Sequence, residues 1–136
     1  MKIVRESVTP ELQGVIRSGF SEHAIEEMGQ DGFSEPIAFV VRQERSCIGV
    51  LVVRSFWGSL HIKNLWVHRD HRKQGIGRAL LSKAFVYGMK EGHAFAFVET
   101  LSFQALEFYQ KLGFVLEYTR NGYAQGISFH YLRRDF

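Results

Sequence analysis

Residues 65–78 read Leu-Trp-Val-His-Arg-Asp-His-Arg-Lys-Gln-Gly-Ile-Gly-Arg. An apolar segment typical of a strand ends at Val67, a polar loop follows, and Gly75 and Gly77 stand where a helix begins. Glycines let the backbone approach a ligand, and the first N–H groups of a helix have no partner within it. The pattern therefore predicts an anion site at a helix start. Its charge comes from Arg69, Arg72, Lys73 and Arg78. A solvated basic loop with ordinary glycines is the alternative.

Two better known phosphate loops are excluded by pattern. The chain has no Gly-x-x-x-x-Gly-Lys-Ser/Thr, so it is not a P-loop NTPase. The third glycine of the dinucleotide fingerprint is also missing, because position 80 is Leu80.

Hydrophobic periodicity outside this stretch predicts an α/β (α+β) layered fold with helices on the faces of a sheet. Thr9 and Pro10 predict the start of a helix that runs, continuous or restarted, to Met28. Two further helices are expected, one after Gly75 and one over residues 102–112. The expected strands are residues 2–7, 37–42, 47–54, 60–67, 94–98, 114–118 and 128–133. The alternation of 60–67 slips after Asn64, which indicates either a β-bulge or a strand buried on both faces.

Length and composition indicate a globular protein. The 136 residues fit a single domain, and the chain is 46% hydrophobic and 23% charged. Apolar runs such as 47–53 are far shorter than the ~20 residues of a membrane helix, so no membrane partner is expected. A charged N-terminus and the lone Cys47 favour a reducing, cytoplasmic location without a disulfide.

A net charge of +3 weakly favours an acidic partner, although it is also ordinary for solubility. Nucleic acid is not expected, because the sequence has no recognition helix, zinc pattern or RNA-binding aromatic motif.

A second motif lies at residues 102–114, Ser-Phe-Gln-Ala-Leu-Glu-Phe-Tyr-Gln-Lys-Leu-Gly-Phe. Together the two motifs resemble those of the GNAT superfamily of acyl-CoA N-acyltransferases, over nearly the whole chain. Val67 and residues 72–77 match its Arg-x-x-Gly-x-Gly motif, and residues 105–114 match Ala-x-x-Phe-Tyr-x-Lys-Leu-Gly-Phe. Residues 56–58, 65–67 and 100–105 look like one subgroup of small bacterial acetyltransferases. Ser102 and Ala124 depart from it, since Asn and Pro are common there.

The resemblance implies one N-acetyltransferase domain over residues 1–136, built on a mixed, mostly antiparallel sheet of six to seven strands flanked by helices. The family's fourth and fifth strands, here 60–67 and 94–99, splay to admit the pantetheine arm of acetyl-CoA. Because that splaying usually needs a bulge, the resemblance favours a bulge near Asn64.

The resemblance also implies acetyl-CoA as co-substrate and no metal. The pyrophosphate is expected on the backbone N–H groups of residues 72–78, and the N–H near Val67 is expected to polarise the thioester carbonyl. The expected cofactor-binding residues are Leu65, Trp66, Val67, Arg72, Lys73, Gln74, Gly75, Ile76, Gly77, Arg78, Ser102, Ala105 and Phe108.

Tyr109 is expected to protonate the departing CoA thiolate, which is reasonable chemistry for a tyrosine in a desolvated site. From helical spacing alone, a core tyrosine is the alternative. Glu99 is the first candidate for the general base, and the other candidates are His61, His68, Glu35 and a water relay. His71 and His130 are expected to be surface or structural. Cys47 lies far in sequence from both motifs, which favours direct attack of the amine on the thioester.

The expected function is acetyl transfer from acetyl-CoA to a primary amine of an unidentified small molecule or protein. A non-catalytic acyl-CoA-binding regulatory module is the alternative, against which Tyr109 argues. The family binds the acceptor at segments that correspond to residues 20–33 and 120–126. Acids in the first segment suit a cationic acceptor, although an ordinary solvated helix face looks the same; they are Glu22, Glu26, Glu27 and Asp31. Many members dimerise, so a homodimer is a further expectation.

Overall fold

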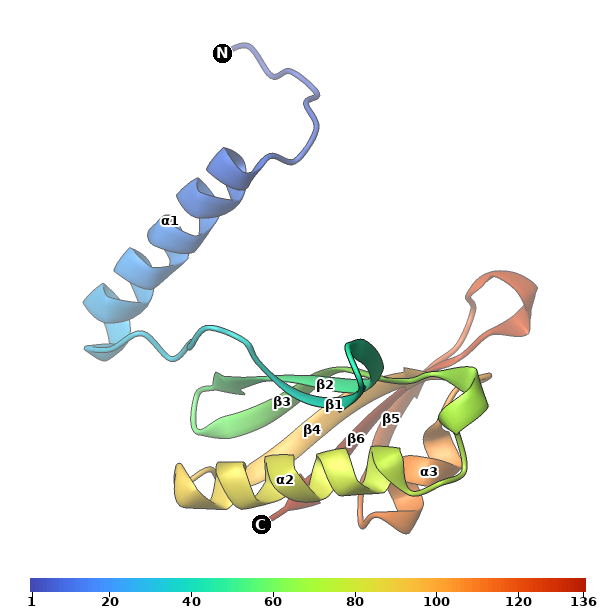
Figure 1. Cartoon of the computed structure of the whole chain (residues 1–136). Coiled ribbons are helices and arrows are strands. Elements are labelled where there is room, and N and C mark those ends of the chain that lie inside the picture. Colours follow the sequence, from blue (N-terminus) through green and yellow to red (C-terminus); the bar gives the residue numbers. More distant parts are fainter. The chain divides into compact units, whose positions relative to one another are not determined.

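The structure is a computed structural model that describes residues 1–136 as two units, Met1–Phe33 and Ser34–Phe136. Each unit is described by itself below (Figure 1).

The first unit contains one helix, α1 (Pro10–Met28). The predicted start is confirmed, because Thr9 is the N-cap and its Oγ1 accepts a hydrogen bond from the N–H of Leu12 at 3.2 Å. Gly29 ends the helix in the left-handed region at φ +78°, and its N–H donates to the carbonyl of Ile25. The helix is continuous.

The strand predicted at residues 2–7 is wrong, because these residues have no regular secondary structure. A strand is stable only when a neighbouring strand completes its hydrogen bonds, and the first unit offers no such neighbour.

The second unit is built on a six-stranded sheet with the order β1-β2-β3-β4-β6-β5. Its strands are β1 (Ile37–Gln43), β2 (Ser46–Phe56), β3 (Ser59–Val67), β4 (Phe95–Leu101), β5 (Val115–Arg120) and β6 (Phe129–Asp135). The pair β3–β4 is parallel, whereas the other four neighbouring pairs are antiparallel. The predicted α/β fold with a mixed, mostly antiparallel sheet is thus confirmed.

Helices α2 (Ile76–Lys90) and α3 (Leu106–Lys111) cover one face of this sheet (Figure 1). In β4, Ala96, Val98 and Thr100 are buried on this face, as the alternation of a half-covered strand requires. Aliphatic side chains from β2, β3 and β6 complete the core with those of α2, at Leu51, Val53, Leu60, Ile62, Leu80, Leu81, Ala84 and Leu132. No helix is long and apolar enough to cross a membrane.

The helix predicted over 102–112 is shorter than expected. Ala105 has φ −134°, and its N–H donates to Thr100 Oγ1 at 3.2 Å instead of entering a helical ladder. This side-chain bond delays the helix until Leu106. The preceding strand also runs beyond its predicted end, to Leu101.

Gly49 in β2 allows α2 to begin close to the sheet. A Cβ atom at Gly49 would lie 2.7 Å from Cγ2 of Ile76 and 3.4 Å from Cδ1 of Leu80. Because β-branched Ile76 has little rotamer freedom in a helix, the helix start would have to shift.

We therefore expect Gly49→Ala to lower the free energy of unfolding by about 1–3 kcal/mol, the usual cost of overpacking. Urea unfolding measures this loss. In the double variant Gly49→Ala/Ile76→Ala the clashing methyl group is gone. The double variant should therefore lose less free energy of unfolding than the two single variants lose together. Strict additivity would show that the two residues do not compete for this space.

Candidate active site

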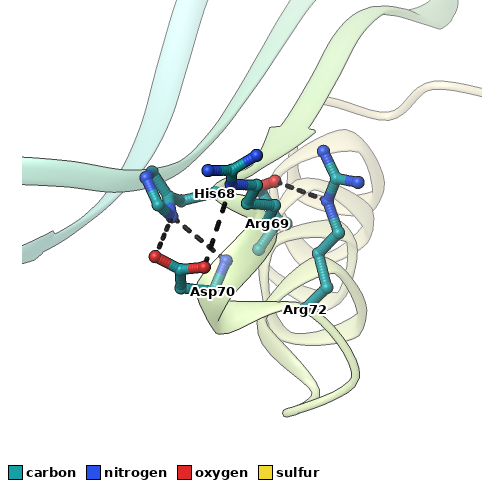
Figure 2. Close-up of polar contacts among 5 residues, drawn as sticks. His68, Arg69, Asp70 and Arg72 are labelled. Carbon is teal, nitrogen blue, oxygen red and sulfur yellow. Dashed lines mark hydrogen bonds and ion pairs between the residues drawn. The ribbon is translucent and has the colours of Figure 1, made fainter.

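The polar loop after β3 folds back onto the end of that strand. The Nε of Arg72 donates a hydrogen bond to the carbonyl of Val67 at 3.0 Å (Figure 2). Asp70 sits in a short 3-10 turn (Arg69–His71), and its N–H donates to Nδ1 of His68 at 3.1 Å. Its carboxylate lies 3.9 Å from Nε of Arg69. Within the loop, the one acid is therefore engaged by Arg69 and not by Arg72.

The start of α2 presents unpaired N–H groups beside this loop. Gly75 is the N-cap at φ +83°, a left-handed conformation that favours glycine, and no side chain caps the helix. The first intrahelical bond runs from the N–H of Ala79 to the carbonyl of Gly75. The N–H groups of residues 76–78 therefore have no helical partner. With the exposed side chains of Arg72, Lys73 and Arg78, they form a site suited to a phosphate or pyrophosphate.

Gly77 links the two sequence motifs in space. A Cβ atom there would lie 3.2 Å from Cζ of Phe108 on α3 and 3.8 Å from a methyl group of Leu65. The glycine therefore lets the first turn of α2 lie against Phe108 and the end of β3. Phe108, Leu65 and the loop residues, which the sequence assigned to one binding site, are thus brought together.

Strands β3 and β4 separate next to this helix start. They pair only where residues Leu60, His61 and Ile62 face Ala96, Phe97 and Val98. In the β2–β3 pair, Val52 faces Asn64 whereas Val53 faces Ile62, so Lys63 is the extra residue of a β-bulge. The predicted bulge near Asn64 and the predicted splaying of the two strands are confirmed.

The bulge leaves backbone donors on the open edge of β3. The N–H of His68 donates to the carbonyl of Ile48 in β2, at 2.8 Å. Because successive residues of a strand face opposite edges, the N–H groups of Leu65 and Val67 point away from β2, toward the gap between β3 and β4. The Val67 carbonyl, which accepts from Arg72, lies on this same edge.

Tyr109 lies on α3 with 5% of its surface exposed. Its ring packs edge-on against Phe108 and Phe114, at centroid distances of 5.3 and 5.5 Å. Burial raises the pKa of Tyr109 to about 12. The hydroxyl is therefore neutral, and available as a proton donor, throughout the physiological range.

This pKa predicts a pH dependence of stability. Folding favours neutral Tyr109, so its contribution is complete below the ordinary pKa of 10.0 and is lost as the pH rises toward about 12. The raised pKa corresponds to a loss of about 2–3 kcal/mol. Urea unfolding should show the stability of the wild type falling by this amount relative to Tyr109→Phe between pH 9 and pH 12. Parallel pH profiles of the two proteins would contradict the raised pKa.

Glu99 and His61 meet where the two strands begin to part. Nε2 of His61 lies 2.8 Å from Oε2 of Glu99, and both side chains are about a quarter exposed or less. The imidazole stacks on Phe97, with centroids 4.4 Å apart and ring planes 6° from parallel. A carboxylate and an imidazole at this distance can share or relay a proton. The structure thus joins two of the sequence candidates for the general base.

The other histidine and acid candidates lie elsewhere. Nδ1 of His68 accepts the hydrogen bond from Asp70 in the loop, and His71 packs edge-on against His68 at 5.7 Å. His130 shares a 2.8 Å hydrogen bond with Thr119 across the β5–β6 pair, which is a structural role. Glu35 lies before β1, at the opposite end of the strand order from β5.

Ser102 and Ala105 lie in the turn between β4 and α3. The Oγ of Ser102 accepts from the N–H of Ser128 at 3.0 Å, and the Ser102 N–H donates to the Ser128 carbonyl at 2.9 Å. These bonds tie the turn after β4 to the segment before β6. The turn that presents Ala105 and Phe108 is therefore fixed to the sheet.

The first expected acceptor segment, residues 20–33, belongs to the first unit. There Asp31 accepts hydrogen bonds from Ser21 Oγ at 2.6 Å and from the N–H of Phe33 at 3.1 Å. The bond from Ser21 and then that from Phe33 lower the pKa of Asp31. The second segment, 120–126, precedes β6 and contains a 3-10 turn, Ala124–Gly126.

A cavity on the other face of the sheet was missed from the sequence. Its lining includes Glu99, Glu117 and the ring of Phe97. The alternation Phe95, Phe97, Glu99 places these side chains opposite Ala96 and Val98, and this pattern could have revealed the shared face.

Comparison with known proteins identifies the family to which these features correspond. The family model of the acetyltransferase (GNAT) domain matches residues 34–116. Streptothricin acetyltransferase A of Bacillus subtilis (strain 168) is 35% identical over 82 residues, which cover 58% of this chain and 47% of that protein. Blasticidin-S acetyltransferase of Streptomyces morookaense is 36% identical over 88 residues, which cover 64% of this chain and 65% of that protein. The chain thus spans about half to two-thirds of these relatives.

A crystal structure from Agrobacterium tumefaciens, described as a candidate acetyltransferase, has a similar fold. It superposes with a TM-score of 0.87 at 26% identity and covers 100% of both chains.

Proposed function

Because this chain belongs to the GNAT family of acetyltransferases, we propose that it transfers an acetyl group from acetyl-CoA directly to a primary amine. The observation that carries this proposal is the parting of β3 and β4 beside the uncapped start of α2. The gap offers backbone donors to an extended ligand, and the helix start offers donors and charge to its phosphates.

The residues present fit acetyl-CoA. We assign the pyrophosphate to the N–H groups of residues 72–78, with charge from Arg72, Lys73 and Arg78. We assign the acyl-pantetheine arm to the gap lined by Leu65, Trp66 and Val67 on one side and by Ser102, Ala105 and Phe108 on the other. Gln74 and Ile76 complete the helix start. Acetyl-CoA supplies an acetyl group activated as a thioester, and no metal is needed for its transfer.

Groups of the chain are assigned to three atoms of the reaction, which are the thioester carbonyl oxygen, the leaving sulfur and the attacking amine nitrogen. The N–H of Val67 faces the gap and is assigned to the thioester carbonyl oxygen, where a fixed donor stabilises developing negative charge. Tyr109 is assigned to the leaving sulfur. A tyrosine with a pKa of about 12 is a weak acid, but the burial that raises it also raises the proton affinity of a thiolate at the same place.

Glu99 is assigned as the general base that takes the proton of the attacking amine. The 2.8 Å contact with His61 gives this proton a second acceptor, so His61 is assigned as its relay or positioning partner. The amine attacks directly. Cys47 packs in β2, where its thiol contacts the carbonyl of Gly49 at 3.5 Å, and it is given no role.

Binding and turnover together test the proposal. Isothermal titration should show binding of acetyl-CoA. In an assay with a panel of primary amines, the protein should release CoA thiol from acetyl-CoA only when an amine is present. A protein that binds acetyl-CoA but releases no thiol with any amine would be the non-catalytic module. Absence of acetyl-CoA binding would overturn both readings. The cytoplasmic location and the homodimer stay predictions, the latter tested by light scattering on purified protein.

A further inference from the structure

The cavity on the sheet face opposite α2 has a volume of about 370 Å³, within the range of small-molecule sites. It lies entirely in the unit Ser34–Phe136, between the β2–β3 turn and strands β4, β5 and β6. Five of its eleven lining residues are aromatic, namely Phe56, Trp57, Phe95, Phe97 and Tyr131. Phe97 contacts Phe56 and Phe95 edge-on or tilted, at centroid distances of 6.0 and 6.1 Å, so these three rings form one cluster.

The cavity carries an excess of negative charge. Its three charged side chains are Glu99, Glu117 and Arg133. Nε of Arg133 donates to Asp135 at 2.7 Å, and its guanidinium lies 3.8 Å above the ring of Phe95, so this positive charge is already paired. Glu99 shares a hydrogen bond with His61, whereas no ion pair engages Glu117. The unmatched charge of the cavity is therefore that of Glu117.

The alternation of β5 places Glu117 on the face of the sheet that carries this cavity. In the β5–β6 pair, Leu116 faces Leu132 and Tyr118 faces Tyr131, so Glu117 is the extra residue of a β-bulge. Because Leu116 shares the face of the buried Leu132, Glu117 next to it lies on the cavity face. The bulge brings Tyr118, which faces Tyr131, to that same face.

The β2–β3 turn supplies an independent observation. Both central residues have positive φ, +45° at Trp57 and +77° at Gly58. Turns of this kind favour Asn-Gly or Gly-Gly, and the left-handed conformation is disfavoured for a large side chain. The strained residue is the one whose indole ring lines the cavity. Strain at such a position indicates a function for the side chain.

We propose that this cavity binds the acceptor amine, and that the acceptor is a small molecule with a second cationic group. The second cation lies against the aromatic wall and pairs with Glu117, since aromatic faces and carboxylates both attract organic cations. The reacting amine lies at Glu99, which lines the cavity and also stands where β3 and β4 part. The placement of the reacting amine at Glu99 rests on the proposed function, whereas the binding of the second cation does not.

A matched pair of amines tests the proposal. Cadaverine has two amino groups, and hexylamine has the same length with one. The variant Glu117→Gln removes the charge and keeps the shape. Glu91→Gln is the control, because Glu91 is an exposed acid at the end of α2, outside the cavity. Turnover is followed by thiol release. Binding is followed by the change in tryptophan fluorescence on adding the amine, which should disappear in Trp57→Phe, where Trp66 is the remaining tryptophan.

We expect the wild type and Glu91→Gln to prefer cadaverine over hexylamine by about tenfold in kcat/KM and in Kd, the size of one charge-assisted contact. Glu117→Gln should lose this preference and keep its activity on hexylamine. Equal affinity for the two amines in the wild type, or an unchanged preference in Glu117→Gln, would overturn the inference. Thiol release without a preference contradicts the cavity alone. Trp57-dependent cadaverine binding without thiol release contradicts the proposed activity alone.

Discussion

Tyr109→Phe is expected to lower kcat by about 100-fold or more, the contribution of a positioned general acid. The affinity for acetyl-CoA should stay unchanged, because the ring that packs between Phe108 and Phe114 is retained. Thiol-release kinetics give kcat, and isothermal titration gives the Kd of acetyl-CoA. A loss confined to kcat is the mark of an interaction made in the reaction and not in binding.

The matched control is Tyr87→Phe. Tyr87 lies on α2 and packs edge-on against Phe39 at 6.1 Å, far in the fold from the start of that helix. The variant Tyr87→Phe also loses a tyrosine hydroxyl group, and it should keep the activity of the wild type. If Tyr109→Phe also kept that activity, Tyr109 would be a core tyrosine, which is the alternative that its helical spacing suggests.

Glu99→Gln is expected to lower kcat by about 100-fold, because the amide has the shape of the carboxylate and cannot take a proton. Glu91→Gln should leave kcat unchanged, since Glu91 is exposed at the end of α2. His61→Gln tests the contact of 2.8 Å separately. If His61 only positions Glu99, His61→Gln should lower kcat less than Glu99→Gln does. It should also leave the Kd of acetyl-CoA unchanged.

The result that would remove Glu99 from the mechanism is full activity of Glu99→Gln. If His61→Gln then lost the larger share of kcat, the imidazole would be the base and the carboxylate its positioning partner. Comparing the pH profiles of kcat in the two variants distinguishes these assignments, because each variant loses a different titrating group.

The features that local patterns carry were predictable from the sequence. The N-cap of α2 has φ +83°, which few residues other than glycine adopt. The glycine at position 75 therefore marks the helix start in the sequence, without knowledge of the fold. The stripe of Ala105, Phe108, Tyr109 and Leu112 has helical spacing, and these residues do pack into the core. The bulge in β3 left a trace as a slipped alternation, but the resemblance was needed to choose between two interpretations.

The features that depend on pairing between distant strands were not predictable. His61 and Glu99 are 38 positions apart, and they meet only because β3 and β4 run parallel in one register. The bulge that brings Tyr118 to the same face as Glu117 is not visible in the sequence of β5 either. The strand expected at residues 2–7 failed for a related reason, since its composition allows a strand but its unit provides no neighbour.

The most direct test of the account is a mass-spectrometric count of both products in one reaction. Purified protein, acetyl-CoA and cadaverine are incubated, and free CoA and N-acetylated amine are quantified against time. Direct transfer predicts that the two products appear in equal amounts and that neither accumulates without the amine. Release of CoA without acetylated amine, or no product with any amine of the panel, would contradict the assignment of this chain as an amine acetyltransferase.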